Sequence, residues 1–227
     1  MHALKETKTK LRPTLIDLSD VLPAHVATRN SYEKDQMIFS PESENMRLYM
    51  VRKGQVVSKA LSNNGTMVGI EILGPEDIFG LEAFVGPYAT AAYCIEPTET
   101  LSWDVKYLAE IGKSNHNLVV GLMQAAINRV VLLQDDVERL ATKTVRSRLI
   151  TFLLKSARST GIRQGNAVVL LGFSHKLIAE FVGTGREVVT SHMIKFKKEG
   201  FLSYSRRSGI RILNLASFTA QLEADEI

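Results

Sequence analysis

Two kinds of hydrophobic spacing divide the chain. From Tyr32 to Trp103, short β-rich apolar runs are separated by glycines, a pattern typical of strands joined by tight turns. From Ser114 to about Thr142, apolar residues recur every three or four positions, which predicts one long amphipathic helix. The segments beyond it keep a helical spacing but are shorter. The chain is therefore expected to be an α+β protein with an antiparallel β-roll first and a helical domain last.

The long helix carries more apolar surface than one contact face uses, because Val131 and Leu132 widen its stripe. A helix that packs both on its own roll and on a second copy of itself would bury both faces, so we expect a homodimer. The alternative is a helix buried within one chain, which Asp135, Asp136 and Glu138 disfavour because they interrupt the apolar belt. The positions spaced close to a coiled-coil heptad are Val119, Leu122, Ala126, Val130, Leu133, Val137 and Leu140.

The run from Phe173 to Leu202 predicts two short helices joined by a glycine turn. Ser174 can cap the first helix, Gly183 can turn the chain, and Gly200 can end the second helix, which covers roughly residues 185–198. Helices joined in this way form a helix-turn-helix, although a plain pair of surface helices is the alternative. The apolar positions available for packing are Leu177, Ile178, Phe181, Val182, Val188, Val189, Ile194 and Phe196.

Charge favours the DNA-binding interpretation. Residues 141–227 hold 14 Lys and Arg against 6 Asp and Glu, whereas residues 1–140 hold 14 against 18. A basic module is what neutralisation of DNA phosphates requires. Two short apolar runs flank Arg206 and Arg207, which predicts a β-hairpin wing beside the second helix. An ordinary solvated turn is the alternative for this arginine pair.

The remaining composition limits the class of protein. A chain of 227 residues, 45% hydrophobic and 23% charged, is long enough for two ordinary globular domains. We expect a cytoplasmic protein, since no unbroken apolar run approaches the ~18 residues of a membrane span and the N-terminal segment is unlike a signal peptide. The single cysteine, Cys94, excludes an intrachain disulfide. Its apolar neighbours favour a small buried hydrophobe over a redox switch.

An enzyme is the rival class. The five histidines are scattered, and the glycines of GTGREV follow a helix instead of a strand, so the segment is not a dinucleotide loop. The sequence therefore predicts no catalytic residue, metal site or cofactor. A second alternative is an effector-binding signalling module that acts through protein contacts instead of DNA.

The order of roll, long helix and basic winged helix-turn-helix resembles the Crp/Fnr family of bacterial transcription regulators. The similarity runs from about Tyr32 to Phe218, and its most specific motifs are DIFG (Asp77–Gly80), VRSRLITFLL (Val145–Leu154) and the run from Ser174 to His192. The last two are most similar to the nitrogen-control (NtcA) branch.

The resemblance implies a regulator that binds double-stranded DNA at a pseudo-palindromic site and contacts RNA polymerase. The roll would resemble a cyclic-nucleotide-binding domain. The implied domains are a sensor roll at residues 1–113, a dimerisation helix at 114–142 and a winged helix-turn-helix at 143–227.

The resemblance also implies which side chains meet DNA. Arg186 matches an arginine that suits guanine, and Glu187 matches a glutamate that suits the cytosine amino group. Ser191 replaces a second arginine, so the outer guanine of the family's usual half-site would be read weakly. His192 replaces an apolar residue, and we favour packing over base reading for it. The predicted DNA-binding residues are Ser174, His175, Lys176, Arg186, Glu187, Thr190, Ser191, Lys195, Arg206 and Arg207.

For the effector, the resemblance argues against cyclic AMP. The family's ribose-binding glutamate is replaced by Leu81, and a strand would turn the next residue, Glu82, to the opposite face. The phosphate-binding Arg–Ser pair is replaced by Ala89 and Thr90. The nitrogen-control branch binds 2-oxoglutarate, and its resemblance places Arg129 in the pocket, paired with a ligand or with Glu82. We therefore expect a small effector other than cyclic AMP, or none. The predicted pocket residues are Phe79, Gly80, Leu81, Glu82, Arg129, Leu133 and Gln134.

Overall fold

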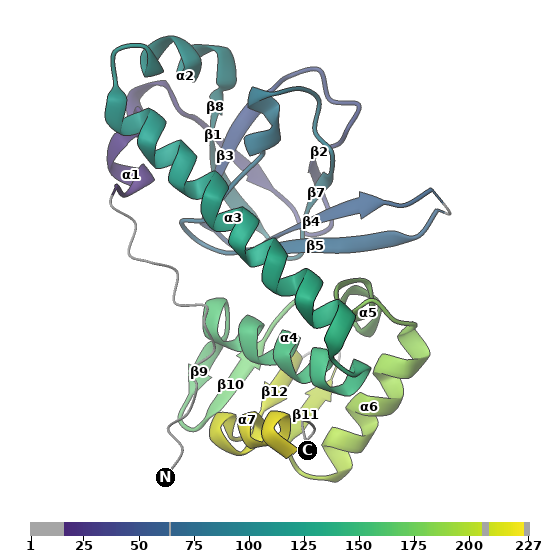
Figure 1. Ribbon diagram of the computed structural model, residues 1–227. Coiled ribbons are helices and arrows are strands. Elements are labelled where there is room, and N and C mark those ends of the chain that lie inside the picture. Colours follow the sequence, from purple (N-terminus) through teal and green to yellow (C-terminus); the bar gives the residue numbers. More distant parts are fainter. Residues whose placement is uncertain (1–15, 64, 206–208, 225–227) are drawn as a thin grey trace, which may run out of the picture.

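The computed structural model describes residues 16–63, 65–205 and 209–224. They form an N-terminal roll of strands, one long helix that crosses it, and a C-terminal domain of helices around a small sheet (Figure 1). The predicted fold class, an α+β chain with a β-roll, a long helix and a winged helix-turn-helix, is confirmed.

Within the described residues, the roll consists of two antiparallel sheets with strand orders β1-β8-β3-β6 and β2-β7-β4-β5. Aromatic rings fill the space between them: Phe39 stacks on Tyr88 with ring centroids 3.8 Å apart, and Tyr49 stacks on Phe79 at 5.1 Å. The strands are β1 (Thr28–Tyr32), β2 (Met37–Phe39), β3 (Arg47–Lys53), β4 (Val56–Leu61), β5 (Met67–Leu73), β6 (Ile78–Phe79), β7 (Ala91–Cys94) and β8 (Thr98–Asp104). Short helices lie around them: α1 (Leu18–Val21), η1 (Ala24–Val26), η2 (Leu81–Phe84) and α2 (Val105–Gly112).

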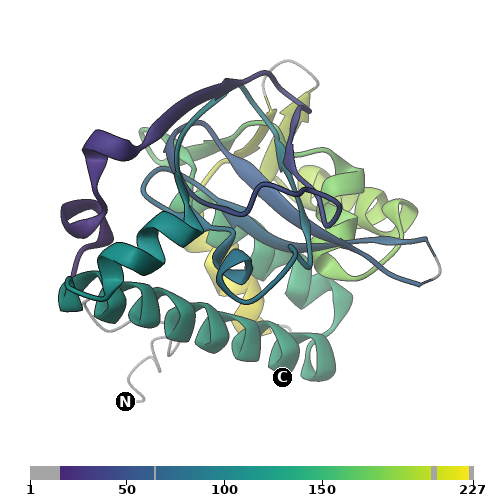
Figure 2. The same cartoon turned by 90° about the horizontal axis from the view of Figure 1, so that it is seen from above.

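The long helix α3 (His116–Thr142) runs along one side of the roll (Figure 2). It begins where the Asn115 side chain accepts a hydrogen bond from the Leu118 amide at 3.1 Å. Its inner face packs closely, because a Cβ atom on Gly121 would lie 2.8 Å from Leu18 of α1. Glycine at this position therefore lets α1 and α3 approach each other.

The outer face of α3 corrects one predicted position of the apolar stripe. Leu122 packs partly against the roll core, whereas Met123 is 53% exposed. One residue is a turn of about 100° on a helix, which moves Leu122 off the outer face. The exposed stripe has strictly alternating spacings of four and three: Val119, Met123, Ala126, Val130, Leu133, Val137 and Leu140. We call these seven residues the outer seam.

The C-terminal domain surrounds a sheet of order β11-β12-β10-β9. The predicted wing is the antiparallel pair β11–β12, in register from Leu202 opposite Ile212 to Ser205 opposite Gly209. The hairpin β9–β10, around Gly165, and the last helix were not predicted, because each is short and lacks a distinctive periodicity. The elements are α4 (Val145–Ser159), β9 (Ile162–Gln164), β10 (Ala167–Leu170), α5 (His175–Val182), α6 (Arg186–Lys198), β11 (Leu202–Ser205), β12 (Gly209–Ile212) and α7 (Leu215–Ala224).

Roll and C-terminal domain share a packed boundary, where the β4–β5 hairpin lies against α5 (Figure 1). Lys59 of β4 and Glu180 of α5 form an ion pair at 2.7 Å, with side-chain exposures of 18% and 9%. A Cβ atom on Gly69 would lie 2.5 Å from the Phe181 ring. The sensor-side hairpin is therefore in direct contact with the first helix of the helix-turn-helix.

Candidate DNA-binding surface and effector pocket

Local hydrogen bonds cap both ends of α5. The Ser174 hydroxyl oxygen accepts a hydrogen bond from the Leu177 amide at 3.1 Å, as predicted for a helix cap. At the other end Gly183 has φ 69°, and its amide donates to the Ala179 carbonyl at 3.0 Å. A left-handed residue at this point ends α5 and turns the chain towards α6.

The buried side of α6 differs in part from the predicted one. Val189 and Phe196 are fully buried as expected, and so is Met193. Val188 and Ile194, predicted to pack, are 41% and 44% exposed. Residues 189, 193 and 196 are spaced four and three apart and share one helix face, whereas positions 188 and 194 lie beside that face.

The opposite side of α6 is free for a partner. Arg186 and Glu187 are exposed in its first turn, and Ser191 and Lys195 are exposed further along. Glu187, Ser191 and Lys195 are four residues apart, so they lie along one line of the helix. In Figure 1, α6 forms the outer edge of the C-terminal domain. An exposed helix with polar side chains along one line has the dimensions of a major-groove reader.

The other predicted DNA-binding residues are placed less uniformly. His175 lies at the start of α5, with its Nδ1 atom 3.0 Å from the half-buried Thr190 hydroxyl of α6. Burial lowers the pKa of His175, and the nearby Arg186 guanidinium lowers it further, so the imidazole is neutral at pH 7. Lys176 is exposed, whereas Arg206 and Arg207 lie outside the described residues.

His192 is half-buried, and its ring centroid lies 6.3 Å from that of Phe196. A ring held beside the buried face of α6 suits the packing role that we favoured.

The predicted orientation of Glu82 in the effector site requires a correction. Gly80 has φ 81°, and the residues after it form the 3₁₀ helix η2 instead of a strand. The alternation of strand faces therefore does not apply to Glu82. Its carboxylate accepts a hydrogen bond from the Thr90 hydroxyl at 3.2 Å, and Thr90 in turn accepts one from Ser58 at 2.9 Å. Negative charge thus lies where the resemblance implies a bound phosphate.

The partner of Arg129 also differs from the prediction. Its Nη1 atom lies 2.5 Å from the Glu71 Oε2 atom of β5, so the ion pair is with Glu71 and not with Glu82. Burial raises the pKa of Glu71, Arg129 opposes that rise, and the carboxylates of Asp77 and Glu82 add to it. The guanidinium is already matched by a carboxylate within the chain.

A cavity of about 260 Å³ lies between α1, β5 and α3. Of the predicted pocket residues, Leu81 and Arg129 line it. Phe79, Gly80 and Glu82 are not among its lining residues, and Leu133 and Gln134 lie exposed on the outer side of α3. The charged side chains of the lining are Asp17, Glu71, Glu76, Asp77 and Arg129. Four carboxylates against one guanidinium make the cavity acidic.

Comparison with known proteins agrees with both halves of the structure. Residues 29–115 match the cyclic nucleotide-binding domain, and residues 147–220 match the Crp-like helix-turn-helix domain. The global nitrogen regulator of Nostoc sp. is 25% identical over 182 residues, which cover 78% of this chain and 82% of that protein. A CRP-like cAMP-activated global transcriptional regulator of Mycobacterium tuberculosis is 24% identical, covering 78% and 80%. The structure of FixK2 from Bradyrhizobium japonicum superposes with a TM-score of 0.75 at 26% identity, covering 86% of this chain and 96% of that one.

The chain is a transcription regulator of the Crp/Fnr family. Its helix-turn-helix, formed by α5 and α6, is therefore a DNA-binding element.

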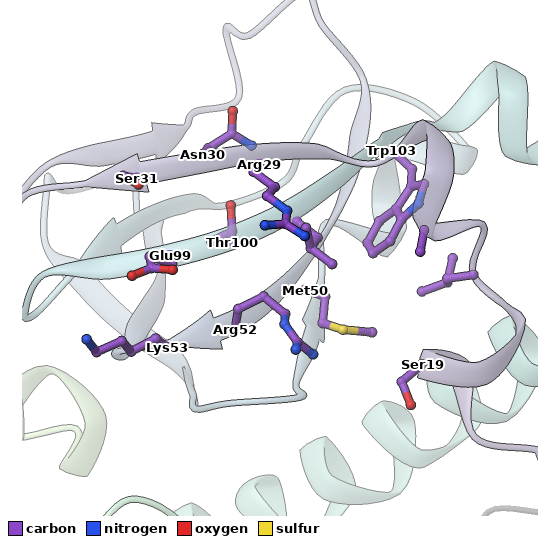
Figure 3. Close-up of a pocket in the computed structure, with 13 residues that line it drawn as sticks. Ser19, Arg29, Asn30, Ser31, Met50, Arg52, Lys53, Glu99, Thr100 and Trp103 are labelled. Atoms are coloured by element: carbon purple, nitrogen blue, oxygen red, sulfur yellow. The ribbon is translucent and has the colours of Figure 1, made fainter.

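This Crp/Fnr regulator has a second, larger cavity, of about 630 Å³, on the face of the sheet formed by β1, β8 and β3 (Figure 3). Arg29, Arg52 and Lys53 line it together with Glu99 and the buried Trp103. No predicted effector residue reaches it. The two cavities differ in charge, since the larger one is basic and the one beside α3 is acidic.

Sequence reasoning missed Glu71 and Lys59, and only Glu71 left a signal. Glu71 is a lone carboxylate in the apolar strand run around Ile70 and Ile72, and Arg129 is a lone cation on an apolar helix face. A buried charge requires a partner, so each could have been matched with the other. Lys59 has no such signal, because its partner Glu180 lies in another domain.

Proposed function

We propose that this Crp/Fnr regulator is a cytoplasmic homodimer that reads a pseudo-palindromic DNA site with one α6 helix in each half-site. The observation that carries the proposal is the exposed line of Glu187, Ser191 and Lys195 on α6, which packing within the chain leaves free. This line belongs to residues 141–227, the basic part of the chain, which holds 14 Lys and Arg against 6 Asp and Glu. Such a surface suits a DNA duplex.

The outer seam of α3 supports the dimer. Its seven side chains follow the four-three spacing of a coiled coil and face away from the roll. Among the described residues, α3 is also long and apolar enough to cross a membrane, judged by length and composition alone. Its inner face packs on the roll and holds the Arg129–Glu71 ion pair. We therefore assign the seam to a second copy of the chain.

For base reading, we propose that Arg186 contacts guanine and Glu187 contacts a cytosine amino group. Lys176, Lys195 and the wing arginines would then contact phosphates. The two α6 helices would lie about 34 Å apart, one DNA repeat. Ser191 is too short to replace an arginine at guanine, so the half-site should be relaxed at that base.

The test uses the full chain and a duplex selected from a random pool. Arg186→Ala should cost about 1–3 kcal/mol on the selected duplex and little on a scrambled one. Equal losses on both duplexes would show that Arg186 contacts only phosphate. Lys176→Ala is the matched control, because a phosphate contact should weaken both duplexes alike.

The effector proposal follows from charge. The cavity beside α3 has four carboxylates and one guanidinium that Glu71 already neutralises. An anion buried there would lack a cationic partner. We propose that neither cyclic AMP nor 2-oxoglutarate controls this protein from the cavity beside α3. Thermal shifts of the wild type and of Arg129→Gln with each compound test this, and a saturable stabilisation that the substitution abolishes would contradict it.

Salt dependence separates this function from a signalling module that acts through protein contacts. DNA binding through several phosphates should weaken steeply as salt increases, whereas a protein interface should respond much less. Contact with RNA polymerase remains part of the proposal, as do the domain limits at residues 1–113, 114–142 and 143–227. We propose no catalytic role, since the relatives are transcription regulators.

A further inference from the structure

The hydroxyl of Thr190 links two helices of the reading motif. Its oxygen lies 2.8 Å from the Arg186 carbonyl, one turn earlier in α6, and donates its hydrogen there. The same oxygen lies 3.0 Å from Nδ1 of His175 in α5. A hydroxyl has one hydrogen, and it is already used, so the second bond requires a hydrogen on the imidazole. The neutral His175 ring therefore carries its hydrogen on Nδ1 and its lone pair on Nε2.

The imidazole also contacts the wing. Its ring meets Tyr204 of β11 edge to face, with centroids 5.3 Å apart and planes 70° apart. On the same tyrosine, Lys197 of α6 places its Nζ atom 5.2 Å from the ring centroid. His175 of α5 thus contacts both α6 and the wing strand β11.

We propose that His175, which the sequence predicts as a DNA contact, is instead a positioning residue for DNA reading: its Nδ1–H group holds Thr190, likewise predicted as a DNA contact, and thereby fixes the rotation of α6 that aims Arg186 and Glu187 at the bases. This deepens the proposed function, because it rests on α6 being the reader. Glu187 and Ser191 lie on either side of Thr190 along the helix. A rotation of α6 about its axis therefore changes the direction in which both side chains point. Sequence-specific contacts require correct aim, whereas phosphate contacts tolerate small shifts.

Two variants separate the hydrogen bond from simple packing. In His175→Asn the side-chain amide can donate from nearly the position of Nδ1, whereas His175→Ala has no donor. On the full-length protein, His175→Ala and Thr190→Val should each weaken binding to the selected duplex about fivefold, the worth of one hydrogen bond. Binding to a scrambled duplex should change by less than about twofold. His175→Asn should recover most of the loss, and adding His175→Ala to Thr190→Val should cause little further loss.

A spectroscopic readout tests the tautomer itself. Long-range proton–nitrogen NMR spectra of the folded protein, recorded above the pKa of His175, should show a protonated Nδ1 and an unprotonated Nε2. An Nε2–H tautomer, or equal losses on both duplexes, would overturn the proposal. So would an asparagine variant no better than alanine. If the wild-type protein failed to prefer its selected duplex, the DNA-reading function itself would fail, which is a different result.

Discussion

Val130 lies at the middle of the outer seam and is 53% exposed in the single chain. Its replacement by glutamate should break the dimer. Complete burial of a valine side chain stabilises by about 1.5 kcal/mol at the lower limit. Since Val130 is about half exposed in the single chain, dimerisation contributes roughly half of this in each copy, and the substitution removes about 1.5 kcal/mol from the two copies together. Two carboxylates facing each other in a buried seam add a larger penalty, so the total exceeds about 3 kcal/mol, or a hundredfold in the dissociation constant.

Sedimentation velocity at micromolar protein measures this change, with circular dichroism as the check on folding. Val85→Glu is the matched control, because Val85 is 91% exposed and lies off the seam. Val130→Glu should sediment as a monomer and bind a duplex with two half-sites far more weakly, while its affinity for a single half-site stays close to that of the wild type. A variant that remained a dimer would refute the assignment of the seam.

Three further outcomes are expected. In a double-mutant cycle on the free energy of unfolding, Lys59→Met and Glu180→Gln should show a coupling of about 1–3 kcal/mol. The exposed pair Arg52–Glu76 should show less than about 1 kcal/mol. Equal couplings would mean that the buried ion pair stabilises the fold no more than an exposed one. Arg129→Gln removes the cation that opposes the raised pKa of Glu71. The loss of stability relative to wild type should therefore be small at about pH 4, where Glu71 is mostly protonated, and should grow as the pH rises through the folded-state pKa of Glu71. A pH-independent loss in urea unfolding would contradict this. Cys94 is fully buried, and burial raises the pKa of its thiol, so a thiol reagent should label the native protein no faster than it unfolds; rapid labelling would revive the redox interpretation.

Much of the fold could be predicted because its signals are local. The glycine-punctuated strands, the long helical spacing, the Ser174 cap and the Gly183 turn each depend on a few neighbouring residues. Side-chain assignments on a helix were less secure. The seam position of Leu122 was wrong, as was the packing of Val188 and Ile194, since a single residue moves a side chain about 100° around the axis.

The effector site was predictable only in part, because its charges pair across elements. The sequence shows that Arg129 needs a partner, but only the structure shows that the partner is Glu71 of β5. The prediction for Glu82 was wrong for a related reason. A strand was assumed after Gly80, and a 3₁₀ helix turns the carboxylate towards Thr90 instead.

The boundary between roll and reading motif explains how the two halves can influence each other. Lys59 and Gly69 of the β4–β5 hairpin both contact α5, and Glu71, the partner of Arg129, lies on the same hairpin. Strand β5 therefore touches α3 through an ion pair and α5 through the Phe181 ring. Because packed side chains transmit displacement instead of absorbing it, a shift of α3 against the roll would act on α5 through this one strand. The position of α5 in turn sets that of α6 through the Gly183 turn and the bond from His175 to Thr190. A change in how β5 sits between α3 and α5 would therefore alter the position of α6.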